Sequence, residues 1–195
     1  LPRRMPKLKA VLFDLDGVLV DTYEVWFFLL NDVAKRHGYP GIDRETYRGS
    51  WGQGMEVDVK KFYPLHTVEQ IRLEYEKYYG DHLEHLKVMD GARAGLEAIR
   101  LPKAVITNSP TLLANKALSI AKVADCFQTV VGCDQVPLSK PAPDGVLLAC
   151  TRLGVTPSET LLVGDSRFDE GAAQAARTGF VWFKSFAELR IPGLG

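Results

Sequence analysis

The sequence predicts an α/β protein: a doubly wound parallel sheet with a helical segment inserted after its first strand. Two observations support this fold class. Short apolar runs rich in β-branched residues alternate with stretches of helical periodicity, which is typical of a parallel sheet covered on both faces. The interval from Asp14 to Thr107, by contrast, is about three times longer than the roughly 30 residues of a βαβ unit. It therefore contains an insertion.

Five apolar runs are expected to form the strands. The first, residues 9–13, ends directly at Asp14. Gly or a polar residue also follows three later runs, which are residues 104–106, 129–131 and 160–163. Residues 180–183 are a plausible fifth strand. Helices are expected between these strands at residues 111–121, 144–153 and 168–177.

The insertion has the pattern of helices. Residues 67–86 carry one apolar stripe at three- and four-residue spacing. The stripe consists of Ile71, Tyr75, Tyr79, Leu83 and Leu86. Residues 22–37 are also helical in pattern, and residues 43–62 form a weaker case that glycines interrupt. We therefore expect an α/β core from residues 5–19 and 89–195, and a helical unit from residues 20–88.

Composition excludes several classes of function. The 195 residues include 24 Lys and Arg against 24 Asp and Glu, so no overall field attracts nucleic acid or an anionic membrane. The longest apolar run, residues 25–30, is far too short to cross a bilayer. The three cysteines form no CxxC pair, which favours a reducing, cytoplasmic location. The expected partner is a small molecule, bound by a monomer or a homodimer.

Polar side chains gather where the predicted strands end. In an open parallel sheet these ends lie along one edge, where ligands bind. Four clusters that are far apart in the sequence are therefore expected to converge. They contain Asp14 and Asp16, Thr107 and Asn108, Lys140, and Asp165 and Asp169. The pair Asp14 and Asp16, or the pair Asp165 and Asp169, is by itself weak evidence for a catalytic site. The position of each pair after an apolar strand makes the evidence stronger.

Four carboxylates in one crevice repel each other, and burying them unpaired is very unfavourable. A hard divalent cation with oxygen ligands removes this conflict. Mg²⁺ suits a site that combines a few carboxylates with a phosphate group. The residues therefore predict Mg²⁺ as the cofactor.

The four clusters, in this order and context, resemble the motifs of the haloacid dehalogenase superfamily. Within it, the chain looks like the phosphoglycolate-phosphatase-like and β-phosphoglucomutase-like branch. The motifs span residues 14–22, 105–109, 139–144 and 163–169. The resemblance covers nearly the whole chain and implies a Rossmann-like core with a helical cap. The motifs are specific for the superfamily but not for a substrate.

The resemblance also implies roles that the chemistry of the residues supports. Asp14 would attack phosphorus and become an aspartyl phosphate, and Asp16 would protonate the leaving group and then activate water. Thr107 would hold a phosphate oxygen, and Lys140 would neutralise the phosphate and Asp14. The metal ligands would be Asp14, the backbone carbonyl of Asp16, Asp165 and, directly or through water, Asp169. Asn108 either lines the site or caps a helix.

The cap is expected to select the substrate. The candidates are Arg48, Trp51 and Gln53, in a stretch that glycines interrupt. Arg48 would hold a carboxylate or a second phosphate by a bidentate contact, unless it is only a surface residue. The neighbouring aromatic residues 26–28 are more often packing residues than a substrate site.

We expect a Mg²⁺-dependent phosphatase of small phosphorylated metabolites. One alternative is a phosphomutase, in which a sugar hydroxyl accepts the phosphoryl group instead of water. Another is a binding or regulatory protein with the same fold and no turnover, although all the motif residues that the chemistry needs are present. A dehalogenase is disfavoured, because the dehalogenases of the family generally lack an aspartate at the position of Asp16.

Overall fold

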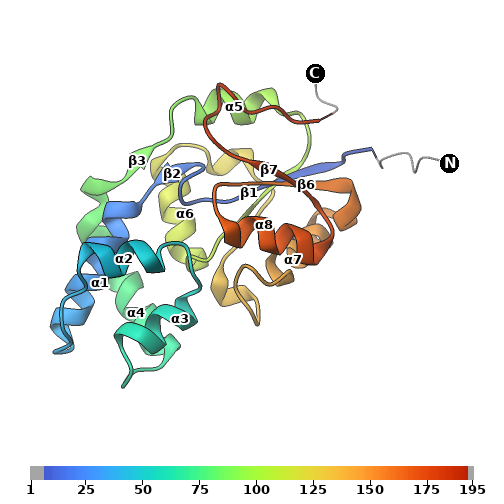
Figure 1. Cartoon of the computed structure of the whole chain (residues 1–195). Coiled ribbons are helices and arrows are strands. Elements are labelled where there is room, and N and C mark those ends of the chain that lie inside the picture. Colours follow the sequence, from blue (N-terminus) through green and yellow to red (C-terminus); the bar gives the residue numbers. More distant parts are fainter. Residues whose placement is uncertain (1–6, 193–195) are drawn as a thin grey trace.

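The structure is a computed structural model that describes residues 7–192 (Figure 1). The expected boundaries at residue 5 and at residue 195 lie outside the described residues. A five-stranded parallel sheet has the order β5-β4-β1-β6-β7. Its strands are β1 (Ala10–Phe13), β4 (Lys103–Ile106), β5 (Thr129–Val131), β6 (Thr160–Gly164) and β7 (Gly179–Trp182). This arrangement confirms the predicted α/β fold class.

Helices cover both faces of the sheet. They are α5 (Ala92–Ala98), α6 (Thr111–Ile120), α7 (Asp144–Leu153) and α8 (Arg167–Ala176). Successive residues of a strand point to opposite faces. In β1, Val11 and Phe13 accordingly pack in one buried cluster with α5 and α6, whereas Leu12 packs in another with α7 and α8. Three short 3₁₀ helices complete the core: η2 (Ala124–Cys126), η3 (Cys133–Gln135) and η4 (Pro157–Glu159).

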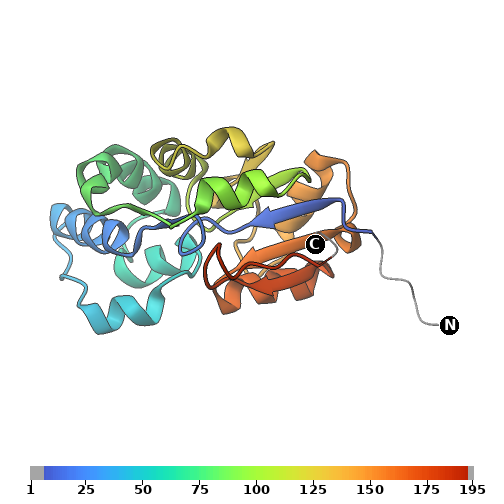
Figure 2. The ribbon, with the colours of Figure 1, turned by 90° about the horizontal axis from the view of Figure 1, so that it is seen from above.

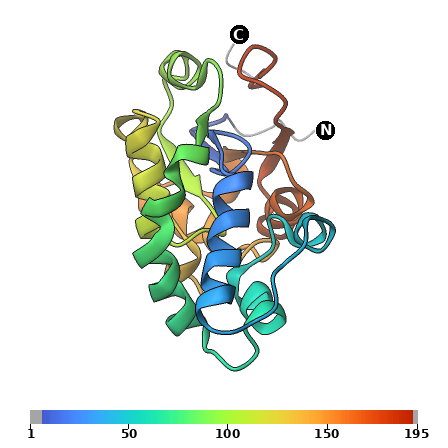
Figure 3. The same cartoon turned by 90° about the vertical axis from the view of Figure 1, so that its left-hand side faces the viewer.

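The inserted segment forms a separate group of helices, which we call the cap. Its elements are α1 (Tyr23–Arg36), α2 (Arg44–Ser50), α3 (Met55–Phe62), α4 (Val68–Tyr78) and the 3₁₀ helix η1 (Tyr79–His85). Figure 2 shows the cap gathered at one end of the sheet, and Figure 3 shows α1 and α4 side by side. The expected stripe contributes to its interior, because Ile71, Tyr75 and Tyr79 are buried in a cluster of aliphatic and aromatic side chains.

One expectation for the cap differs from the structure, whereas the expected interruption of residues 43–62 by glycines is observed. Residues 67–86 do not form one helix, because the α-helix ends at Tyr78 and continues as a 3₁₀ helix that contains Gly80, a poor helix former. Residues 43–62 form two helices, α2 and α3. Between them Gly52 adopts a φ of +82°, a left-handed conformation that interrupts a right-handed helix.

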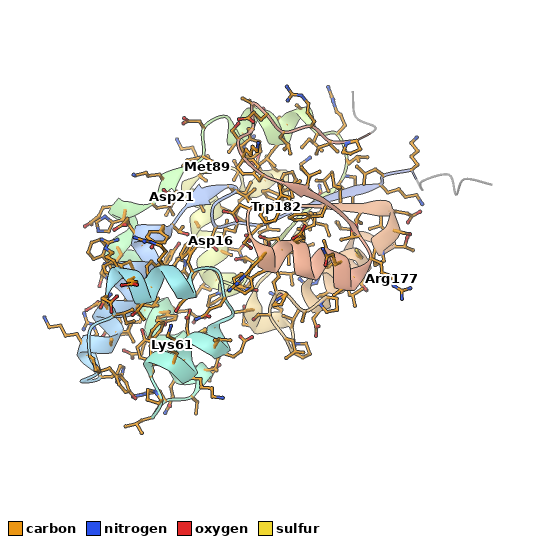
Figure 4. All side chains as sticks on the ribbon, viewed as in Figure 1. Asp16, Asp21, Lys61, Met89, Arg177 and Trp182 are labelled. Carbon is orange, nitrogen blue, oxygen red and sulfur yellow. The ribbon has the colours of Figure 1, made fainter. Side chains whose placement is uncertain are left out.

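A two-stranded antiparallel ribbon joins the cap to the sheet. Its strands, β2 (Val20–Asp21) and β3 (Lys87–Val88), pair Val20 with Val88 and Asp21 with Lys87. The Met89 amide extends the ribbon by donating to the Leu19 carbonyl at 3.1 Å. Asp21 and Met89 are labelled in Figure 4. The sequence analysis missed this ribbon, because two-residue strands are too short to show a period.

The helices within residues 7–192 are either too short or too polar to cross a membrane.

Candidate active site

The predicted polar residues follow the carboxyl ends of three neighbouring strands. Asp14 follows β1, Thr107 follows β4 and Asp165 follows β6. Backbone pairing continues one residue past two of these strands. The Asp14 amide donates to the Val163 carbonyl at 2.9 Å, and the Thr107 amide donates to the Val131 carbonyl at 3.0 Å. The sheet therefore fixes the backbone positions of Asp14 and Thr107.

A buried ammonium group lies between two buried carboxylates. Lys140 Nζ is 2.7 Å from Asp14 Oδ1 and 2.5 Å from Asp169 Oδ1, and it donates to the Ile106 carbonyl at 3.3 Å. Burial opposes the charge of this ammonium, but the two carboxylates outweigh it and raise the pKa of Lys140. Burial and then the Asp169 carboxylate raise the pKa of Asp14 well above its ordinary value, although Lys140 opposes this shift. One cation is thus shared by two buried acids and compensates their charge only in part.

A third carboxylate completes a group with the chemistry of a magnesium site. Oxygen atoms of Asp14, Asp165 and Asp169 all lie within 4.8 Å of one another. Burial, followed by the Asp169 carboxylate, raises the pKa of Asp165 to about 6. The part of this shift that comes from neighbouring negative charge is what a divalent cation would offset. The all-oxygen donor set fits Mg²⁺.

Gly17 gives the Asp165 side chain the space that it occupies. Gly17 has a φ of +86°, and a Cβ atom placed on it would lie 2.0 Å from Asp165 Oδ2. The sequence analysis did not identify this contact. Gly17 therefore lies against Asp165, a candidate metal ligand. A side chain at position 17 would displace the Asp165 carboxylate.

Three hydroxyl groups hold the Asp16 carboxylate. Thr22 donates a short hydrogen bond to Oδ1, while Thr107 and Ser109 donate to Oδ2 at 3.1 and 2.9 Å. The Ser109 amide in turn donates to Thr107 Oγ1 at 3.0 Å. The second motif therefore contributes to the site by orienting Asp16. In Figure 4, Asp16 lies between the cap and the sheet.

Asn108 connects the cap to the segment that carries Lys140. Its Nδ2 donates to the Gly52 carbonyl at 3.0 Å and to the Lys140 carbonyl at 3.1 Å. Its Oδ1 accepts from the Lys140 amide at 2.8 Å. A second contact between cap and core joins Ser139 Oγ to Glu56 Oε2 at 3.1 Å. The Asn108 side chain thus makes three hydrogen bonds to backbone groups.

A cavity extends from these residues into the cap. At the core it is lined by candidate reaction residues, including Asp14, Asp16, Lys140 and Asp165. Its cap half has mainly apolar and aromatic walls, formed by Trp26, Leu30, Tyr47, Trp51, Met55 and Tyr75. The polar side chains of the cap half are Ser50, Gln53 and Asp58. Trp51 and Gln53, two of the three predicted cap candidates, therefore face this cavity.

The structure does not bring Arg48 to the cavity. Arg48 is exposed and lies outside the lining, whereas its neighbours Tyr47 and Ser50 are buried and line it. Thr107 also lies outside the lining, because its hydroxyl is directed to Asp16. Trp26, interpreted from the sequence as a packing residue, contributes both to the cap interior and to the cavity wall.

Among the cavity residues that the sequence analysis missed, Asp58 is the one with a charged side chain. The available signal was its place in α3, between the buried Met55 and Val59, where an apolar residue is expected. Burial raises the pKa of Asp58 to about 7, while the hydrogen bond from Gln53 lowers it. A carboxyl group on an apolar helix face is unusual enough to indicate a functional role.

Comparison with known proteins supports the resemblance. The haloacid dehalogenase-like hydrolase family model matches residues 11–183. An N-acetylmuramic acid 6-phosphate phosphatase from Pseudomonas aeruginosa is 33% identical over 88% of this chain and 80% of the relative. A phosphoglycolate phosphatase from Chromobacterium violaceum is 34% identical over 87% of this chain and 82% of the relative.

A solved structure shares the fold. CbbY from Rhodobacter sphaeroides, crystallised as a mutant with xylulose-(1,5)bisphosphate, has a TM-score of 0.81 at 22% identity, covering 93% of this chain and 96% of that chain. The family match spans most of the sequence, and the motif residues meet at one edge of the sheet. The chain therefore belongs to the haloacid dehalogenase-like hydrolase family and is a phosphatase of that family.

Proposed function

We propose that the chain hydrolyses a small phosphorylated metabolite through an aspartyl-phosphate intermediate, with Mg²⁺ as cofactor. The carrying observation is the environment of Asp14. Within residues 7–192, the hydrogen bonds to its carboxylate come from the Leu15 amide and Lys140, each at 2.7 Å, and both end on Oδ1. Oδ2 is thus left to act as the nucleophile, and Asp14 lines the cavity.

The reaction has two steps. Asp14 Oδ2 forms a bond to phosphorus while the bond from phosphorus to the alcohol oxygen breaks, and protonated Asp16 gives its proton to the departing oxygen. Asp16, now ionised, then takes a proton from water, whose oxygen attacks the phosphoryl group and releases phosphate from Asp14. Lys140 stabilises negative charge on the phosphoryl group, since its ammonium is held beside Asp14.

Mg²⁺ would be held by Asp14 and Asp165, whose oxygens lie in one group with those of Asp169. When bound, it supplies positive charge that offsets the charge of the carboxylates and the phosphate. The Asp169 carboxylate already accepts a hydrogen bond from Lys140 on Oδ1. Its Oδ2 accepts hydrogen bonds from the Ser166 amide and hydroxyl. Asp169 therefore orients the site and contributes to the metal through a remaining lone pair or through water.

The substrate is expected to be a small phosphate monoester. The relatives named above are called phosphatases of phosphoglycolate and of N-acetylmuramic acid 6-phosphate. The cavity beside Asp14 opens into the cap, which leaves room for the alcohol part of such an ester. The three free cysteines are consistent with action in the reducing cytoplasm.

The test is phosphate release from a panel of phosphorylated metabolites, with and without Mg²⁺ and with a chelator. Asp14→Asn is expected to lower kcat by at least about a thousandfold, because the amide is a poor nucleophile. Asp81→Asn, an exposed carboxylate on η1, is the matched control and should retain full activity. Full activity of Asp14→Asn would overturn the proposal, and isomerised sugar phosphate without phosphate release would instead indicate a mutase.

A further inference from the structure

Within residues 7–192, no side chain that lines the cap half of the cavity carries a positive charge. Among the described residues that line the whole cavity, Lys140 is the only cationic side chain, and it is already paired with Asp14 and Asp169. Lys61 is an exposed residue outside the lining, although its ammonium donates to Ser50 Oγ at 2.8 Å and lowers the pKa of Asp58. A second anionic group on a substrate would therefore find no cation among the described residues that line the cap half.

The tyrosine hydroxyls of the cap half are already used inside the cap. Tyr47 donates to the Tyr23 carbonyl at 2.7 Å. Tyr75 donates to the Tyr63 hydroxyl at 3.2 Å, and Tyr63 donates to the Leu30 carbonyl at 2.8 Å. With these donors committed, the rings of Tyr47 and Tyr75 contribute mainly apolar surface to the cavity, as the neighbouring tryptophans do.

Asp58 is the charged side chain of this apolar half. Gln53 Nε2 donates to its Oδ1 at 2.6 Å, and within residues 7–192 no hydrogen bond reaches Oδ2. The pKa of about 7 leaves the carboxyl group largely ionised at pH 8. An ionised carboxylate in an apolar wall attracts hydrogen-bond donors and repels anions, and both effects are stronger than they would be in water.

We propose that the cap selects phosphate esters of uncharged, hydroxyl-bearing alcohols and disfavours esters whose alcohol part carries a second anionic group. A hydroxyl of the substrate would donate to Asp58, and its carbon skeleton would pack on the aromatic walls. This inference rests on the proposed phosphatase function and names the substrate class of the same site. It separates this chain from enzymes that act on a phosphorylated carboxylic acid.

Two matched substrate pairs test the preference. In each, a CH₂OH group replaces a carboxylate: 2-hydroxyethyl phosphate against phosphoglycolate, and sorbitol 6-phosphate against 6-phosphogluconate. At pH 8, with saturating Mg²⁺, wild-type protein is expected to favour the uncharged member by at least about tenfold in kcat/KM. An equal rate, or a preference for the carboxylate, would overturn the inference.

Asp58→Asn tests the residue itself. Removing the charge while keeping the shape should reduce the ratio within each pair severalfold, mainly by raising kcat/KM for the carboxylate. Glu45→Gln removes an exposed charge from α2, outside the cavity, and should leave the ratio unchanged. An unchanged ratio in Asp58→Asn would remove Asp58 from the explanation. Should this variant fold poorly, the wild-type ratios still decide whether the preference exists.

The simple ester p-nitrophenyl phosphate separates this inference from the proposed function. Its cleavage by wild-type protein, lost in Asp14→Asn, supports the phosphatase mechanism independently of Asp58. If that cleavage occurs but neither pair is hydrolysed, the inference about the substrate class is wrong and the proposed function stands. If p-nitrophenyl phosphate and all other esters resist cleavage, the proposed function itself fails.

Discussion

The two halves of the cavity hold charge in opposite ways. At the sheet edge, Lys140 is held between Asp14 and Asp169 at ion-pair distance. In the cap, Asp58 lies among apolar and aromatic side chains and receives one hydrogen bond from Gln53. The core half is built to compensate a concentration of charge, as phosphoryl transfer requires. The cap half is built to discriminate between alcohols, since a single charge in an apolar wall has a large influence there.

The most severe way to disturb the core half is to remove its buried cation. Lys140→Met leaves the buried Asp14 and Asp169 without their cationic partner, and we expect kcat to fall by about a thousandfold or more. Thermal denaturation should also show a less stable protein. Lys116→Met, on an exposed position of α6, is the control and should match the wild type. Normal turnover by Lys140→Met would show that the ammonium has no part in the reaction.

A smaller effect is expected from moving one candidate metal ligand. Gly17→Ala would place a methyl group against the Asp165 carboxylate, and we expect a loss of about a hundredfold in kcat/KM with a higher Mg²⁺ requirement. Gly38→Ala separates this steric effect from backbone strain. Gly38 also has a positive φ, of +73°, but a Cβ there would have nothing within 4 Å. Equal activity of the two variants would contradict the role of the contact with Asp165.

Removing the hydrogen bonds that connect the two halves of the cavity should reduce kcat/KM moderately. Asn108→Ala removes hydrogen bonds to Gly52 and to both backbone groups of Lys140, and we expect kcat/KM to fall about tenfold. Ser139→Ala removes the hydrogen bond to Glu56, which also joins core and cap, and should have a smaller effect. Steady-state kinetics of the two variants make the comparison. A larger loss in Ser139→Ala would show that docking of the cap matters more than the position of Lys140.

The smallest expected effect is a pH dependence of stability. The pKa of Asp165 is raised from 3.8 to about 6, so between these values the folded protein binds a proton that the unfolded chain has released. Without metal, this group therefore makes stability fall as the pH rises through that range. Mg²⁺ needs the ionised carboxylate, so its stabilising effect should grow over the same range.

We expect the increase in Tm caused by Mg²⁺ to be a few degrees larger at pH 7 than at pH 5. Asp165→Asn should lose most of this pH dependence, while Asp81→Asn keeps it. Differential scanning calorimetry with and without Mg²⁺ gives the comparison. The same increase at both pH values would mean that Asp165 does not bind the metal.

The core half was predictable from the sequence because strand ends are visible in it. An apolar run that stops at Asp14 fixes where that side chain emerges, and parallel pairing brings Thr107 and Asp165 to the same edge. The cap half was not predictable to the same degree. In a helix, the next residue points about 100° away. Because Tyr47 and Ser50 of α2 are buried, Arg48 points outward. A helix of only seven residues is too short for the sequence pattern to show which of its sides faces the cavity.

Asp58 was hidden for a related reason. Its position in α3 is correct for an inward-facing residue, but its residue type is typical of a surface, so the helix pattern and the chemistry pointed in opposite directions. The ends of the cap helices were also difficult to predict from the sequence. The change from α4 to the 3₁₀ helix η1 falls at Tyr79, which is buried inside the cap, and the nearby local signal in the sequence is Gly80.

The short ribbon of β2 and β3 has a consequence for how such proteins are modified. Asp21 and Lys87 are directly paired, so the inserted helices begin and end at neighbouring points of the core. A segment with adjacent ends can be exchanged without stretching the rest of the chain. Chimeras joined at residues 21 and 87 could therefore combine one reaction centre with caps of different selectivity, making this ribbon a natural junction for recombination and design.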